Sequence, residues 1–158
     1  LPISISHQWV PEDLVFTGQA RDTSFWTYVF RRRKTFMELG DPIRVSDFAD
    51  KEDPTLAIAE LILKNWQQSY KIQPHFIIAR ILTQHPGRLS RHELQTKVQN
   101  FLIRYKGTLQ LTDAKKVVRI GLKLLKDRKL INETVEGFSI LNPSLVEYYG
   151  NFIPAELT

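Results

Sequence analysis

The stretch TDAKKVVRIGLKLLKDRK, residues 112–129, decides how the second half of the chain folds. At about 100° per residue, its basic side chains share one arc of a helix and its apolar side chains lie opposite. We therefore predict an amphipathic helix from near Thr112 to about Arg128. The apolar side is Val117, Val118, Leu124 and Leu125, and the basic side is Lys115, Lys116, Arg119, Lys123 and Lys126.

The segments around this helix predict a small domain. After it, LINETVEGFSIL (residues 130–141) places Gly in a turn between two β-prone runs, which is typical of a hairpin. Before it, residues 74–84 predict a helix that stops at Pro86, and Ser90 with Glu93 forms a capping box that starts another. Three helices followed by a hairpin are the order of a winged helix, which we expect over residues 73–158.

The N-terminal part predicts strands. Residues 1–6, LPISIS, alternate aliphatic residues with polar ones, and residues 34–39 are the best nearby pairing candidate. Because two strands alone are marginally stable, we expect residues 1–50 to be the last strands of a larger α/β domain, cut from a longer protein. Asp53 and Pro54 predict the start of a helix that connects the two parts across residues 51–72. The expected fold class is thus α/β.

Composition excludes several classes of protein. The 158 residues contain no cysteine, which excludes disulfide scaffolds, zinc ribbons and cysteine nucleophiles. No run approaches 18 uncharged apolar residues, so no spanning helix is expected. The four histidines lack a spacing that would pair two of them on one helix face, and no phosphate loop or nucleophile elbow occurs. We expect no metal, no cofactor and no catalytic residue in this chain.

The charge distribution favours anionic partners. The net charge is +5, and residues 104–129 alone hold nine basic residues against two acidic ones. The basic helix face has three interpretations: a solvated surface, a recognition helix for nucleic acid, or a contact for anionic lipid or a protein. Side chains that read base edges are scarce on that face, which counts against sequence-specific readout.

A second basic cluster, Arg31, Arg32, Arg33 and Lys34, follows four aromatic residues between Phe25 and Phe30. Such a cluster is typical of a membrane-surface anchor or of a platform for single-stranded nucleic acid. The alternative is a set of core aromatic residues followed by a solvated turn. We favour that alternative because aromatic residues are most often used to pack a small core.

Several segments resemble one enzyme family in the same order along the chain. LPISIS (residues 1–6) and FMELGDPIRVSDF (residues 36–48) resemble strands of the glycerol-3-phosphate and lysophosphatidate acyltransferase superfamily, with Leu39 where Phe is common. Residues 74–82, 89–94 and 147–153 resemble the tail of its larger members. The resemblance implies the C-terminal portion of an enzyme that acylates glycerol phosphate or a lysophospholipid.

The resemblance also implies partners and a location. The donor would be acyl-CoA or an acyl-carrier protein, and the protein would be cytoplasmic and peripheral to an anionic membrane surface. The family's base is a His followed after four residues by Asp, but Glu12 stands at that place after His7, and the Glu-Gly-Thr motif is absent. We therefore expect these residues alone to be inactive.

Two alternatives belong to other functional classes. A winged-helix module could use the same basic face to bind nucleic acid without any enzymatic role. A structural or docking domain would instead use an apolar stripe along the connecting helix, if that stripe is exposed. The stripe consists of Leu56, Ala59, Leu63, Trp66 and Tyr70.

Overall fold

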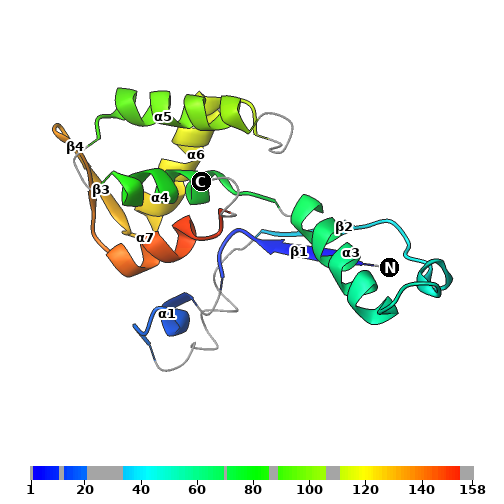
Figure 1. Cartoon of the computed structure of the whole chain (residues 1–158). Helices are drawn as coiled ribbons and strands as arrows, with labels where there is room; N and C mark the ends of the chain where they lie inside the picture. Colours follow the sequence, from blue (N-terminus) through cyan, green and yellow to red (C-terminus); the bar gives the residue numbers. More distant parts are fainter. Residues whose placement is uncertain are drawn as a thin grey trace. The chain divides into compact units, whose positions relative to one another are not determined.

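The computed structural model describes residues 2–10, 13–20, 34–69, 71–85, 89–105 and 111–153. The fold is α/β and mostly helical, with two small antiparallel sheets of two strands each (Figure 1). The chain divides into two compact units. The strand unit is Leu1–Trp9 with Arg32–Lys71, and the helical unit is Val10–Arg31 with Ile72–Thr158.

The strand unit contains β1 (Ile3–His7), β2 (Thr35–Leu39), the 3-10 helix η1 (Val45–Phe48) and α3 (Pro54–Ser69). The predicted pairing is confirmed: β1 and β2 are antiparallel, with Ile3 opposite Leu39 and Ile5 opposite Met37. The outer face of the pair is apolar. These four side chains are 52%, 66%, 47% and 64% exposed, whereas Ser4 and Ser6 on the other face are buried.

Helix α3 begins where the sequence predicts. The carboxylate of Asp53 accepts a hydrogen bond from the backbone N–H of Leu56 at 2.9 Å, and Pro54 is the first helical residue. The predicted stripe is exposed at Leu56, Ala59, Leu63 and Trp66, and Tyr70 lies outside the described residues. The exposure that a docking role would require is therefore present at the four described positions of the stripe.

The helical unit is built around α4. Its elements are α1 (Asp13–Phe16), α4 (Pro74–Gln84), α5 (Arg91–Arg104), α6 (Ala114–Asp127), β3 (Ile131–Thr134), β4 (Gly137–Ile140) and α7 (Pro143–Gly150). Helix α4 contacts α5, α6 and α7, and most of its residues are buried (Figure 1). Gly150 allows the close approach of α7, because a β-carbon there would lie 3.2 Å from the Cα of Arg80.

The predicted helices and hairpin are confirmed, with α6 beginning two residues later than expected. Asp113 caps α6 by accepting from the N–H of Lys116 at 3.1 Å. The capping box of α5 is present, with both Ser90 and Glu93 in their expected roles. The hairpin is also joined to the chain before α5, since the N–H of Phe138 donates to the carbonyl of Leu89 at 3.1 Å.

Two helices, α1 and α7, were not predicted, and they meet at a buried charged cluster. Asp13 is fully buried and accepts hydrogen bonds from the Arg128 guanidinium and the Tyr149 hydroxyl. Arg128 also donates to the Tyr149 oxygen at 2.8 Å. Burial is the largest single influence on Arg128 and opposes its charge, but the hydrogen bonds and charges of Asp13 and Tyr149 together outweigh burial and raise the pKa of Arg128. The pKa of Tyr149 is also raised, mainly because its hydroxyl is buried.

Candidate anion-binding surfaces

The predicted basic face of α6 is present. Its five basic side chains are exposed, and the opposite side of the helix, including Val117, Val118 and Leu125, is buried. Leu124, predicted with the apolar side, is half-buried. The five exposed residues are Lys115, Lys116, Arg119, Lys123 and Lys126.

Carboxylates pair with the two basic side chains in the C-terminal half of this face. Lys123 pairs with Asp127 at 2.7 Å, and Lys126 pairs with Glu133 at 2.7 Å. Arg91 also binds Glu133, at 3.0 Å. The hydrogen bond from Arg91, and to a smaller extent the one from Lys126, holds the pKa of Glu133 below its ordinary value. The C-terminal half of the face therefore carries less net charge than its lysines suggest.

The N-terminal half of the face carries uncompensated charge. Lys115, Lys116 and Arg119 form no ion pair with any described residue. The first two lie in the first turn of α6, where the Asp113 carboxylate caps the backbone N–H groups but pairs with neither lysine side chain. These three side chains are thus the part of α6 best placed to attract an anion.

The other predicted basic cluster is mostly outside the described residues. Arg31, Arg32 and Arg33, with the aromatic residues between Phe25 and Phe30, all fall there. Lys34 is described and exposed, and its carbonyl accepts from the N–H of Gln8 at 2.9 Å.

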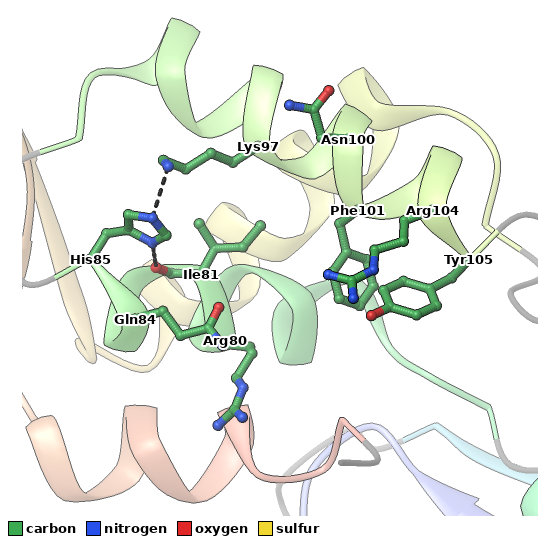
Figure 2. A pocket seen from close by; sticks show the side chains of 9 residues that line it. All are labelled: Arg80, Ile81, Gln84, His85, Lys97, Asn100, Phe101, Arg104 and Tyr105. Carbon is green, nitrogen blue, oxygen red and sulfur yellow. Dashed lines mark hydrogen bonds between the residues drawn. The ribbon is translucent and has the colours of Figure 1, made fainter. Parts of the chain in front are cut away.

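A second basic surface, absent from the sequence predictions, lies between α4 and α5 (Figure 2). This groove has a volume of about 280 Å³ and no carboxylate among its lining residues. Its basic residues come from two helices and the residue after α4, and its aromatic residues come from the end of α5. They are Arg80, His85, Lys97 and Arg104, with Phe101 and Tyr105.

One end of the groove holds a fixed lysine. The Nδ1 of His85 lies 3.0 Å from the carbonyl oxygen of Ile81, which can only accept, so this nitrogen carries the proton. The Nε2 of His85 then accepts from the ammonium of Lys97 at 2.8 Å. Figure 2 shows both bonds. The imidazole therefore positions Lys97 without neutralising it.

The other end of the groove holds an arginine over a tyrosine. The Arg104 guanidinium lies 5.4 Å from the centre of the Tyr105 ring, which itself contacts Phe101 with ring centres 4.8 Å apart. The Tyr105 side chain is buried, and its hydroxyl has no hydrogen-bond partner among the described residues. Figure 2 shows this hydroxyl on the groove side of the ring, beside Arg104.

Arg80 contributes less directly. Its guanidinium extends toward α7, away from Lys97, and donates to the Asn151 side-chain oxygen at 3.4 Å (Figure 2). One sequence signal could have indicated the groove: Lys97 and Arg104 are seven residues apart, two turns along one face of α5. Their proximity to His85, however, depends on how α4 and α5 pack.

Comparisons with known proteins return no relative: no family model, no curated protein and no solved structure matches the chain. Within the described ranges, no helix is both long and apolar enough to cross a bilayer. The same residues contain no group of three or more His, Cys, Asp or Glu side chains that could hold a metal ion.

Proposed function

We propose that this chain is the C-terminal portion of a glycerophospholipid acyltransferase, and that its helical unit contacts anionic headgroups through α6. The observation that carries the proposal is a contact within the strand unit between residues 1–6 and residues 36–48, the two segments there that resemble the acyltransferase family. The N–H of Gly40, in the segment LGDPI, donates to the carbonyl of Pro2, in LPISIS, at 2.9 Å. A β-carbon at Gly40 would lie 2.9 Å from the Cγ of Pro2, so a larger residue would disturb the contact.

The open face of the strand pair supports the same proposal. Ile3, Ile5, Met37 and Leu39 form an exposed apolar face, and a two-stranded sheet is marginally stable by itself. Packing of this face against further elements of a catalytic domain would remove it from water. The strand pair would then be one part of a larger sheet domain, as the resemblance implies.

The proposed reaction moves an acyl group from a thioester to a hydroxyl. The acceptor oxygen forms an ester bond with the acyl carbon, the carbon–sulfur bond breaks, and the hydroxyl proton ends on the thiol. The base expected of the family is a His with an Asp five residues later, and none of the four histidines here has that partner. In this proposal the base is supplied by protein outside these residues.

The experiment is to read the coding sequence ahead of Leu1 and assay the whole encoded protein for acyl transfer. We expect a His-x-x-x-x-Asp motif upstream, and transfer from acyl-CoA or acyl-carrier protein to glycerol 3-phosphate or lysophosphatidate. Replacing that upstream His should abolish transfer. A reading frame without the motif, or acyl transfer by the 158 residues alone, would contradict the proposal.

The headgroup contact is tested by vesicle sedimentation of this chain. Each basic residue close to an anionic surface contributes about 1 kcal/mol, so Lys115→Glu with Arg119→Glu should reduce binding to phosphatidylglycerol vesicles by tenfold or more. Lys64→Glu, an exposed charge reversal on α3, is the matched control and should bind as the parent does. Equal binding to neutral and anionic vesicles would exclude this role for α6.

A second candidate is a winged-helix module that binds duplex nucleic acid. The observation that favours it is the Phe138 to Leu89 bond, which attaches the hairpin to the segment between the first and second helices of the set α4, α5 and α6. This attachment, with α6 immediately before the hairpin, supports α6 as the recognition helix of such a module. A gel-shift series should then show duplex binding that weakens with salt and is lost in Arg119→Glu. Binding that is insensitive to both would exclude this candidate.

A further inference from the structure

We infer that residues 13–20, the docking arm, bind the helical unit as a short peptide binds a recognition site, and that a second copy of this chain can supply the arm. The arm follows β1 and precedes β2, yet it belongs to the helical unit, whose residues 72–153 form the body. Two copies that exchange arms would form a dimer through contacts that each copy otherwise makes within itself. This inference does not depend on the acyltransferase proposal.

The first anchor of the docking arm is an acid held by two donors of the body. The Asp13 carboxylate is fully buried and accepts from the Arg128 guanidinium and the Tyr149 hydroxyl. Arg128 also donates to the Tyr149 oxygen at 2.8 Å, so the two donors are joined by a bond of their own. The end of α6 and helix α7 thus together present a site for one carboxylate.

Two further anchors follow at three-residue steps along the docking arm. The ring of Phe16 stacks with that of Tyr148, with ring centres 6.2 Å apart. The side-chain amides of Gln19 and Asn142 exchange two hydrogen bonds, at 3.0 and 2.7 Å. The arm therefore offers an acid, an aromatic ring and an amide to α7 and its capping residue. Side-chain anchors at regular spacing are typical of short segments that dock on a folded domain.

The docking arm is joined to the body through side chains and not through its backbone. Among the described residues, every backbone hydrogen bond that residues 13–20 make ends within residues 10–20. Asp13 is the one buried residue of the arm, and its apolar residues Leu14 and Val15 are half-buried. The arm can therefore leave and rebind as a unit, without breaking a sheet ladder or opening the core of the body.

A second copy of this chain is the partner that carries the matching segment. Each copy has the same three anchors, so the contacts made between copies repeat those made within one copy. The arm of the same chain has the advantage of a high effective concentration at its own body. Exchange should therefore become detectable when the contact within each chain is weakened and the contact between chains is not.

The test mixes two variants of the whole 158-residue chain, each with one half of the acid contact removed. Asp13→Ala has an intact body and a defective arm, whereas Arg128→Met has an intact arm and a defective body. In an exchanged heterodimer, one contact regains the carboxylate with the guanidinium, and the other joins two apolar side chains. After the variants are refolded together, heterodimer should exceed either homodimer by about tenfold or more. Affinity capture of one tagged variant followed by light scattering measures this.

Two mixtures serve as controls for the heterodimer. Asp13→Ala refolded with the parent should form no excess of heterodimer, because each good contact made between chains removes one made within the parent. A chain that carries both Asp13→Ala and Arg128→Met has a matched apolar contact of its own, so it should elute as the parent does.

A cross-linking experiment keeps the carboxylate and guanidinium intact. The chain contains no cysteine, so a single introduced cysteine in each copy reports where the docking arm lies. Gln19→Cys refolded with Asn142→Cys and treated with a short bis-maleimide should give a cross-linked dimer. Lys115→Cys replaces Asn142→Cys in the control and should cross-link far less, because it lies about 20 Å along α6 from Arg128.

Three results would overturn the inference. The first is no heterodimer from Asp13→Ala with Arg128→Met, although circular dichroism shows both variants folded. The second is as much heterodimer when Asp13→Ala is mixed with the parent. The third is cross-linking of Gln19→Cys that is no greater with Asn142→Cys than with Lys115→Cys, and this result decides if either variant of the acid contact does not fold.

Discussion

Gly121 of α6 lies directly against Ile78 of α4, with no room for a side chain. A β-carbon at Gly121 would lie 2.6 Å from the Cγ1 of Ile78 and 2.8 Å from the carbonyl oxygen of Pro74. Both contacts are closer than real β-carbons approach other atoms. The glycine therefore sets how closely the basic helix packs on the central helix of the unit.

The first prediction concerns Gly121→Ala. At contacts this close overpacking should cost about 2–3 kcal/mol, and the better helix propensity of alanine returns about 1 kcal/mol, so the free energy of unfolding should fall by about 1–2 kcal/mol. Urea unfolding followed by circular dichroism measures the change. Lys115→Ala, on the exposed side of the same helix, should change it by less than about 0.5 kcal/mol. A Gly121→Ala protein as stable as the parent would contradict the packing described here.

The second prediction concerns the buried cluster of Asp13, Arg128 and Tyr149. Asp13→Ala leaves a largely buried guanidinium without its counter-ion and should cost about 3–5 kcal/mol. Replacing both charges, in Asp13→Ala with Arg128→Met, should be less destabilising than Asp13→Ala alone. A double-mutant cycle in denaturant measures this coupling. If the two changes simply add, the ion pair does not contribute as the geometry indicates.

The third prediction concerns pH. Bonds from Arg91 and Lys126 lower the pKa of Glu133 from 4.5, so this carboxylate stabilises the folded state above that value. The contribution is lost as pH falls through the lowered folded-state pKa. The stability difference between the parent and Glu133→Gln, about 1 kcal/mol or less near pH 6, should therefore shrink as pH falls below the ordinary glutamate pKa and vanish once pH is below the lowered folded-state pKa.

The control for Glu133 is the Arg91→Ala with Lys126→Ala background. There the carboxylate has lost both partners, so Glu133→Gln should have little effect at either pH. A difference between parent and Glu133→Gln that stays constant from about pH 6 to about pH 3 would show that charge on Glu133 is not the cause.

The fourth prediction concerns Lys129, which has a positive φ of 56° just after α6. The N–H of Leu130 donates to the carbonyl of Leu125 at 3.0 Å and that of Lys129 to Lys126 at 2.8 Å, which is a Schellman end. Glycine adopts this backbone without strain, so Lys129→Gly should add about 0.5–1 kcal/mol to the free energy of unfolding. Thermal unfolding should show no such gain for Lys129→Ala. An equal gain in both variants would point to charge instead.

Elements set by near neighbours in the chain are the most predictable part of this fold. The capping box at Ser90 acts over three residues, and the Asp53 and Pro54 pair marks the first turn of α3. The two faces of α6 follow from its spacing alone. The start of α7 carried the same kind of signal, since Asn142 accepts from the N–H of Leu145 at 3.1 Å and Pro143 follows it.

Features that depend on distant residues could not be read in this way. Helix α1 is one turn long and is anchored by Asp13 to Arg128, 115 residues later. Alternation along residues 3–7 predicts a strand with two faces, but it does not say that the serines are the buried ones. The groove requires α4 and α5 to be packed before His85 meets Lys97.

The route of the chain between β1 and β2 affects where the protein can be cut into stable fragments. Residues 13–20 follow the first strand and precede the second, yet they belong to the helical unit and are held there by Asp13. A clone that starts at Ile72 would lack α1 and leave Arg128 without its counter-ion. Cleavage near Lys71 would leave α1 on the first fragment and the remaining helices of that unit on the second, so both fragments would be needed to complete the helical unit.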